Sequence, residues 1–234
     1  MDEPLFFASR IKVERAEHFI RELEAELESY RRSRPLSAKL NLDEDPPTVS
    51  VRWASIPPRH GAIIGDALHN LRTALDLMAS ELARLNGESD KNVHFPFSDA
   101  PQDYDSAIRR KGFHKTGADA VALLKQFKPY RGGNELLRAL HALDIQDKHT
   151  NLIPTAKHMN VKINGHYDAA KLDAQGMNVE GDIALVFPES GLLGGENVIQ
   201  TLKDLVRLVN DILEAFASVV AQRKPSAPAR KSRD

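Results

Sequence analysis

The sequence contains no cysteine, and this absence excludes disulfide bonds and thiolate metal sites. It also lacks an apolar run long enough to cross a bilayer, and its first residues lack the basic and apolar segments of a secretory signal. Neither sign of charge is in excess, because 32 basic residues face 33 acidic ones and the net charge is -1. Binding of nucleic acid would therefore need a local patch, and we expect a cytoplasmic protein with no membrane partner.

Most of the chain has the apolar periodicity of amphipathic helices, in which apolar side chains recur at steps of three and four residues. The expected helices cover residues 10–32, 57–86, 104–110, 118–127, 134–151 and 196–222. Asn134 is the expected N-cap of its helix. Residues 88–116 are polar and interrupted by prolines, so we predict a surface connection there with one short helix. His94, Phe95, Pro96 and Phe97 are expected to form an apolar anchor for this connection.

Alternation of apolar and polar residues marks two pairs of short strands. LSAKLNL (36–42) and TVSVRWA (48–54) surround a DEDPP turn, which predicts a hairpin. MNVKINGHYD and DIALVFP alternate in the same way within residues 155–188, and we expect them to join the hairpin in one sheet. The predicted fold class is α+β, mainly α: an antiparallel helical bundle with a small antiparallel sheet.

The sequence predicts a single helical-bundle domain over residues 1–223, with β segments near 36–55 and 155–188. Residues 224–234 are basic and rich in proline, which is typical of a disordered tail. A homodimer is expected because most soluble oligomers are symmetric pairs.

Three polar side chains occupy one flank of an otherwise apolar helix in the stretch GDALHNLRTALD (65–76). At 100° per residue, His69, Arg72 and Asp76 lie beside the stripe of leucines, together with Gly65. Small residues on that flank allow a close approach by a neighbouring element. We therefore expect Arg72 and Asp76 to be half-buried and to need partners.

The helix over 134–151 places two carboxylates, Asp144 and Asp147, on its core-facing stripe. Buried carboxylates are costly unless a cation or hydrogen-bond donors pair with them. Arg72 is the expected partner, because a guanidinium binds a carboxylate in bidentate fashion. The predicted polar network consists of Arg72, Asp76, Asp144 and Asp147, with His69 and His149 at its edge.

Three interpretations of this network remain open. The preferred one is structural, a satisfied polar cluster that fixes the register of two helices. A site for phosphate or RNA around Arg72, His69 and His149 is the second. A metal site is the least favoured, because the spacings match no metal-ligand signature. It would use His69, Asp76, Asp144, Asp147 and His149.

A local basic cluster follows the predicted short helix over 104–110. Its members, Arg109, Arg110, Lys111 and Lys115, surround Phe113, and such a patch contacts phosphates while its aromatic ring stacks on a base. A solvated basic turn is the simpler interpretation of the same residues. No phosphate-binding loop, dinucleotide fingerprint, nucleophile elbow or zinc-protease motif occurs, so we predict no cofactor and no metal.

GDALHNLRTALDLMASEL, followed downstream by LLRALHALDIQDKHTNL, resembles an uncharacterised bacterial family with the motifs GDxLHNLRxALDH and DKHR, over roughly residues 10–155. The family's arginine and the histidine five residues later resemble the R-x4-H element of HEPN-like domains. Those domains are helical bundles, often dimeric, and many are metal-independent ribonucleases. The resemblance implies that Arg72 stabilises phosphate charge. This chain has Leu77 in place of the histidine and Thr150 in place of the downstream arginine.

Because leucine cannot exchange a proton, the resemblance implies a non-catalytic or degenerate HEPN-like protein that binds RNA or a protein partner. One alternative is an active metal-independent endoribonuclease of the toxin or defence type, in which Arg72 acts with His69 or His149. The other is a purely structural or assembly protein. The sequence leaves enzymatic activity open and favours its absence.

Overall fold

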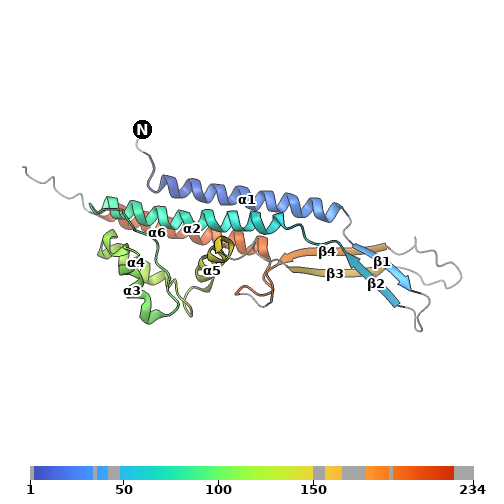
Figure 1. Ribbon diagram of the computed structural model, residues 1–234. Helices are drawn as coiled ribbons and strands as arrows, with labels where there is room; N and C mark the ends of the chain where they lie inside the picture. The colour runs from blue at the N-terminus through green and yellow to red at the C-terminus, as the bar shows by residue number, and fades with distance from the viewer. Residues whose placement is uncertain are drawn as a thin grey trace, which may run out of the picture. The chain divides into compact units, whose positions relative to one another are not determined.

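The computed structural model describes residues 3–33, 36–41, 48–149, 156–164, 178–189 and 192–223 (Figure 1). As predicted, the chain is mainly helical. Its α-helices are α1 (Phe7–Arg32), α2 (Arg59–Leu85), α3 (Tyr104–Arg110), α4 (Ala118–Phe127), α5 (Glu135–His149) and α6 (Val198–Gln222). Its strands are β1 (Leu36–Asn41), β2 (Thr48–Trp53), β3 (Ala156–Asn164) and β4 (Asn178–Val186).

The ends of α2 and α5 follow from their sequences. Gly87 adopts a left-handed conformation (φ 77°) after α2, and the amides of Gly87 and Glu88 donate to the carbonyls of Arg84 and Ala83. This is the Schellman arrangement, which satisfies the last helical carbonyls. At the start of α5, Asn134 Oδ1 accepts a hydrogen bond from the Leu137 amide at 2.9 Å. The predicted N-cap is therefore confirmed.

The strands pair in two separate antiparallel ribbons. β1 pairs with β2, with Leu36 opposite Trp53, and β3 pairs with β4, with Ala156 opposite Val186. Among the described residues, these pairs are two two-stranded sheets instead of the one sheet predicted from the sequence. Alternation within each strand indicated that it pairs, but such a pattern does not determine which edges come together.

The sequence predicted a disordered tail and the absence of a membrane span. The predicted tail, residues 224–234, lies outside the described residues, as does the segment that joins β3 to β4. None of the helices that the structure describes is both long and apolar enough to cross a membrane.

The contacts within the chain divide it into two compact units, and each is described here by itself. The first unit comprises residues 1–15, 70–141 and 205–234, and the second comprises residues 16–69 and 142–204. The prediction of a single domain stays a prediction.

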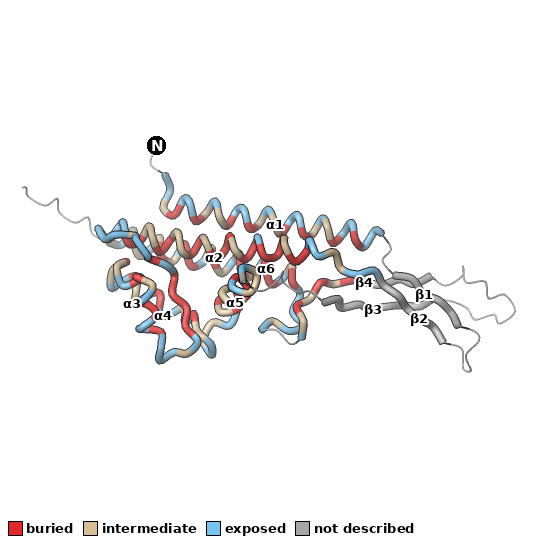
Figure 2. Tube along the Cα trace, in the orientation of Figure 1, coloured by how far each residue is buried: buried red, intermediate tan, exposed pale blue. Residues whose placement is uncertain are grey.

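The first unit has an aromatic core, much of it supplied by the segment between α2 and α3. Phe95 is fully buried, and its ring lies 5.2 Å from that of Phe97 and 6.2 Å from that of Phe113. Phe113 in turn meets Phe216 of α6 edge to face. The red stretch that leads from α2 toward α3 in Figure 2 shows this burial along the chain. The expected apolar anchor at Phe95, Pro96 and Phe97 is therefore confirmed, whereas the prediction of a surface position is wrong for Phe113, whose ring is in the core.

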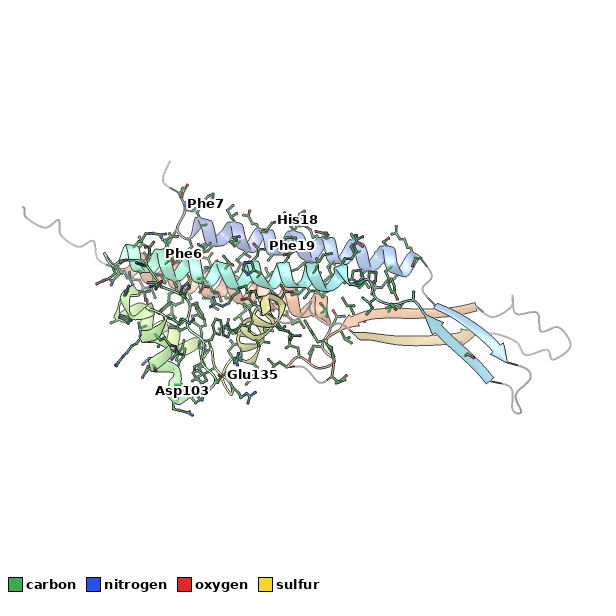
Figure 3. The ribbon with its side chains drawn as sticks, viewed as in Figure 1. Phe6, Phe7, His18, Phe19, Asp103 and Glu135 are labelled. Carbon is green, nitrogen blue, oxygen red and sulfur yellow. The ribbon has the colours of Figure 1, made fainter. Side chains whose placement is uncertain are left out.

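The start of α1 is fixed within the first unit by its backbone as well as by an aromatic ring. Phe6 is fully buried, whereas its neighbour Phe7 is 41% exposed (Figure 3). Phe6 has a positive φ of 58°, and its amide donates to Glu81 Oε1 at 3.0 Å. A positive φ is unfavourable for a bulky residue, so this hydrogen bond and the burial of the ring compensate for local strain.

The second unit has an aliphatic core, and side-chain hydrogen bonds to backbone carbonyls lie at its edge. Buried side chains come from α1, α2, β4 and α6: Ala16, Ile20, Leu23, Leu27, Ile63, Ile64, Leu68, Ile183, Leu185, Val198 and Leu202. The Arg31 guanidinium donates from Nη2 to the Ile183 carbonyl at 2.6 Å, and Tyr30 Oη donates to the Ala54 carbonyl at 2.6 Å. These hydrogen bonds tie the end of α1 to backbone carbonyls of its own unit.

Candidate functional site

Arg72 and Asp76 lie one helical turn apart on α2 and form an ion pair, with Nη1 2.6 Å from Oδ1. The Arg72 side chain is only 8% exposed, and that of Asp76 is 28% exposed. The angles at Nη1 do not suit a hydrogen bond. The contact is therefore an electrostatic pairing at short range.

The same two side chains hold the backbone of one residue in the segment after α2. Asp76 Oδ1 accepts the Phe95 amide at 2.8 Å, and Arg72 Nη2 donates to the Phe95 carbonyl at 3.2 Å. Both polar groups of a fully buried residue are thereby satisfied. We call this arrangement of Arg72, Asp76 and the Phe95 backbone the Arg72 clasp.

An aromatic stack extends from the clasp. The Arg72 guanidinium carbon lies 4.7 Å from the centroid of the Phe97 ring, a cation–π distance. The Phe97 ring is also stacked on His141 of α5, with centroids 4.3 Å apart and planes 4° from parallel. Arg72 therefore contacts the segment through its backbone and through a ring, while its Nη1 faces Asp76 without forming a hydrogen bond.

The other predicted network residues belong to the second unit. Asp144 is buried, and its carboxylate meets His69 Nδ1 at 3.1 Å and Lys148 Nζ at 2.7 Å. The structure thus brings Arg72 to Asp76 and His69 to Asp144. The pairing of Arg72 with carboxylates of α5 stays a prediction, since those carboxylates lie in the second unit.

Asp147 has an unfavourable electrostatic environment. Burial raises the pKa of the Asp147 carboxyl above its usual range, and the negative charges of Asp66 and Asp144 raise it further. Its carboxylate lies directly against Gly65, where a side chain would collide with it. The close approach at Gly65 is made by the Asp147 side chain, whereas a neighbouring backbone was expected there.

The predicted metal site has no support among the described residues. His149 is the last residue of α5, and its side chain lies outside the described part of the chain. In the part that is described, no three histidine, aspartate or glutamate side chains are grouped so that they could hold a metal ion.

The predicted basic cluster is divided by the fold. Phe113 is fully buried between Phe95 and Phe216, so the prediction that its ring stacks on a base is wrong. Lys115 Nζ donates to the carbonyls of Ser89 and Lys91, at 3.4 Å and 3.2 Å. The aromatic residue was placed at the surface because its neighbours are basic, but burial of its large apolar area decides its position.

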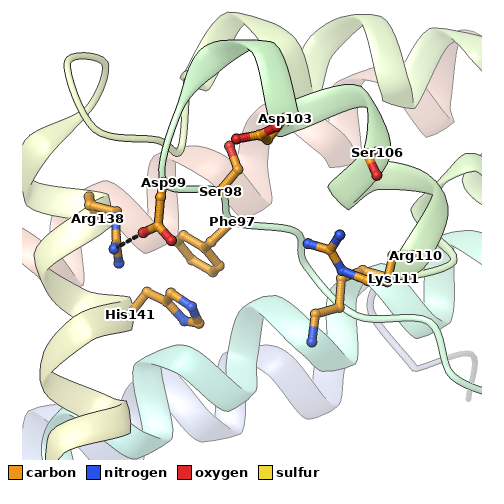
Figure 4. Close-up of a pocket in the computed structure, with 9 residues that line it drawn as sticks. All are labelled: Phe97, Ser98, Asp99, Asp103, Ser106, Arg110, Lys111, Arg138 and His141. Atoms are coloured by element: carbon orange, nitrogen blue, oxygen red, sulfur yellow. Dashed lines mark hydrogen bonds and ion pairs between the residues drawn. The ribbon is translucent and has the colours of Figure 1, made fainter.

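Arg109, Arg110 and Lys111 remain accessible at the end of α3, and two of them face a cavity. A hollow of about 470 Å³ in the first unit is lined by Arg110 and Lys111 together with side chains of α5 and of residues 97–103 (Figure 4). We call it the basic hollow. Its full lining is Phe97, Ser98, Asp99, Asp103, Ser106, Arg110, Lys111, Arg138 and His141.

The charges around the basic hollow differ in how they are paired. Arg138 Nη2 donates to the carboxylate of Asp99. Arg110 and Lys111 form no ion pair within the described part of the chain, because the acidic side chains there pair with other cations or lie beyond contact distance. The hollow thus has three cations and two carboxylates, Asp99 and Asp103, in its lining; Arg110 and Lys111 form no ion pair with either, which leaves an excess of positive charge suited to an anion.

The sequence pattern indicated two residues of the hollow but not the others. Arg110 and Lys111 were part of the basic cluster, whereas Arg138 and His141 lie 27 and more residues downstream on α5. Their spacing of three places them on one helix face, which is a weak signal by itself. Asp99 had no signal, because its role depends on a loop conformation.

Comparison of the chain with protein-family models, with curated proteins and with solved structures finds no match.

Proposed function

We propose that this chain is a non-catalytic HEPN-like protein that binds RNA through the basic hollow. The supporting observation is that Arg110 and Lys111 face the hollow without an ion-pair partner in the described residues, with Arg138 opposite them. Contacts between cations and phosphates supply most of the sequence-independent affinity for nucleic acid. In a chain with a net charge of -1, such a concentration of free cations is the feature best suited to RNA.

The environment of Arg72 supports a non-catalytic form. The resemblance assigns phosphate stabilisation to this residue, but its side chain is 8% exposed and is engaged by Asp76, Phe95 and Phe97. A phosphate would have to displace these groups to reach the guanidinium. Leu77 stands where the family has its histidine, so the same helix also lacks the proton-transfer group at that position.

A cytoplasmic homodimer, which the sequence led us to expect, is part of the proposal. The HEPN-like resemblance implies a two-fold assembly, and light scattering of the purified chain measures the molar mass directly. A dimeric mass is the expected result. A monomeric mass would remove the dimer from the proposal and would leave RNA binding to be judged by its own test.

The test of RNA binding uses fluorescence anisotropy with short single-stranded RNAs of mixed sequence. We expect binding that weakens steeply with salt, and a loss of affinity of about tenfold or more in the double variant Arg110→Glu, Lys111→Glu. Arg109→Glu is the matched control, because Arg109 lies on the same helical turn but does not line the hollow. Absence of binding, or binding that the double variant Arg110→Glu, Lys111→Glu leaves unchanged, would contradict the proposal.

The same RNAs, incubated with the protein in EDTA, test the alternatives. We expect them to remain intact. Cleavage that leaves 2',3'-cyclic phosphate ends and disappears in Arg72→Ala would favour the endoribonuclease instead. Intact RNA with no binding would favour the assembly protein or a protein partner.

A further inference from the structure

The basic hollow is formed by three segments of the chain that converge from different directions. Ser98, Asp99 and Asp103 come from the segment before α3, and Arg110 and Lys111 come from its end. Arg138 and His141 project from α5 on the opposite side (Figure 4). The lining side chains therefore come from three segments around a hollow that is open to solvent on one side.

Its size is that of a site for one small group. About 470 Å³ lies within the range of roughly 300 to 1,000 Å³ that is typical of small-molecule sites. One nucleotide fits such a space, whereas several consecutive nucleotides need an extended channel. The hollow is therefore suited to the end of a strand.

The charge of the hollow distinguishes a terminal phosphate from an internal one. A phosphomonoester has a charge of about -1.5 to -2 at neutral pH, whereas an internal phosphodiester has a single negative charge. Arg110 and Lys111 present two cations that form no ion pair among the described residues, although the carboxylate of Asp103 also lines the hollow. Two such cations gain about twice the Coulomb energy from the dianion.

Asp99 occupies the position where an anion would bind Arg138. The Arg138 side chain is recessed, at 17% exposed, whereas that of Asp99 is 88% exposed and reaches back to the guanidinium. A surface carboxylate held in this way gains little net stability, because it loses side-chain freedom and remains in water. An incoming phosphate can therefore replace Asp99 at small cost and receive the same guanidinium donors.

We infer that the basic hollow binds the terminal phosphomonoester of an RNA strand. Arg110 and Lys111 contact the phosphate, and Arg138 joins them when the phosphate displaces Asp99. This inference rests on the proposed RNA binding and specifies which part of the RNA the hollow accepts.

The test compares three RNAs of one sequence with an internal fluorophore: one with a 5'-phosphate, one with a 3'-phosphate and one with hydroxyl groups at both ends. We expect one phosphorylated form to bind about tenfold more tightly than the hydroxyl form. The form that binds better identifies the end that is recognised. Melting curves of every variant verify that the protein is folded.

Variants locate the preference. Arg110→Ala and Lys111→Ala should each reduce the preference to about twofold or less, whereas Arg109→Ala should leave it intact. Asp99→Asn should increase affinity for the phosphorylated RNA alone, because the competing carboxylate is neutralised.

Three results would overturn the inference. Equal and measurable binding of all three RNAs would contradict end recognition and leave the proposed RNA binding standing. A preference for phosphate that persists in Arg110→Ala and Lys111→Ala would place the site elsewhere. Absence of binding to every RNA would overturn the proposed function, and the inference with it.

Discussion

The Arg72 clasp and the basic hollow meet at Phe97, which contacts Arg72 and also lines the hollow. The two sites use positive charge in opposite ways. In the clasp, Asp76, the Phe95 carbonyl and the Phe97 ring all contact the guanidinium. In the hollow, Arg110 and Lys111 have no such partners among the described residues.

The difference separates the motif residue, Arg72, from the residues that we propose to bind a ligand. Arg72 belongs to the part of the sequence with the most distinctive pattern, yet its contacts are those of a structural residue. The cations that are accessible to a ligand come from an ordinary basic turn. Where a charge is already compensated inside the protein, it stabilises the fold, and where it is not, it is available for binding.

The largest expected effect is that of removing the clasp's cation. Arg72→Ala leaves Asp76 without its partner and the Phe95 carbonyl without its donor, and we expect the free energy of unfolding to fall by about 3–5 kcal/mol. Chemical denaturation measures this loss. Arg84→Ala is the control, since Arg84 is on the same helix in an exposed pair with Asp90 and should change stability by about 1 kcal/mol or less. Equal effects of the two variants would show that the clasp is not a structural element.

A smaller loss is expected when only the anion of the clasp is changed. Asp76→Asn retains a side-chain oxygen that can accept the Phe95 amide but removes the charge that balances Arg72. We expect a loss of about 1–3 kcal/mol. If thermal denaturation shows Asp76→Asn to be as damaging as Arg72→Ala, the hydrogen bond to Phe95 was lost together with the charge.

Sequence periodicity predicted the helices closely. The start of α1 was expected at residue 10 and lies at Phe7, and α3 and α4 have the predicted bounds. The hairpin of β1 and β2 was also predicted, because local alternation and turn residues specify it. Contacts determined by long-range packing could not be obtained in this way. Those contacts include the pairing of the strands as two ribbons and the burial of Phe113.

The candidate site was predicted only in part, for a physical reason. Arg72 and Asp76 were expected to be half-buried and to need partners, with Asp144 and Asp147 as the partners of Arg72. The partners found are each other and the backbone of Phe95. A peptide group is the same at every residue, so no sequence pattern marks it as a partner. The hollow was missed as a cavity because Arg138 and Arg110 meet only after the loop around Asp99 has folded.

His60 is a buried polar side chain that is neither hydrogen-bonded among the described residues, as Arg72 is, nor open to a ligand, as Arg110 is. Its side chain is 1% exposed, and neither ring nitrogen has a hydrogen-bond partner in the described part of the chain. Burial lowers the pKa of His60 below its usual value, and the charge of Arg59 lowers it further.

The pH dependence of stability tests this environment. The unfolded chain takes up a proton at His60 near pH 6.5, whereas the folded chain resists it. Stability from this group is therefore present above about pH 6.5 and is lost as the pH falls through that value. We expect His60→Phe to unfold with a shallower pH dependence between pH 7 and 5 than the parent chain. Parallel curves would contradict the burial of a neutral imidazole.

The smallest effect on stability is expected in the hollow itself. Arg110→Ala and Lys111→Ala remove charges that no protein group compensates in the described residues, so each should change the free energy of unfolding by about 0.5 kcal/mol or less. Denaturant titrations of these variants beside Arg72→Ala measure the contrast directly. A large loss in either would mean that the hollow, too, is part of the structural framework.

The clasp does for Phe95 what neighbouring strands do for a residue inside a sheet. One side chain accepts a hydrogen bond from the amide and another donates one to the carbonyl, so a single residue gains both hydrogen bonds that a strand would otherwise supply. Because the two side chains contact atoms common to every residue with an amide hydrogen, the hydrogen bonds themselves reject only proline at this position. Two side chains of one helix can thus fix the backbone of an irregular segment at a single residue. The residues on either side, Pro96 among them, need not adopt a strand conformation.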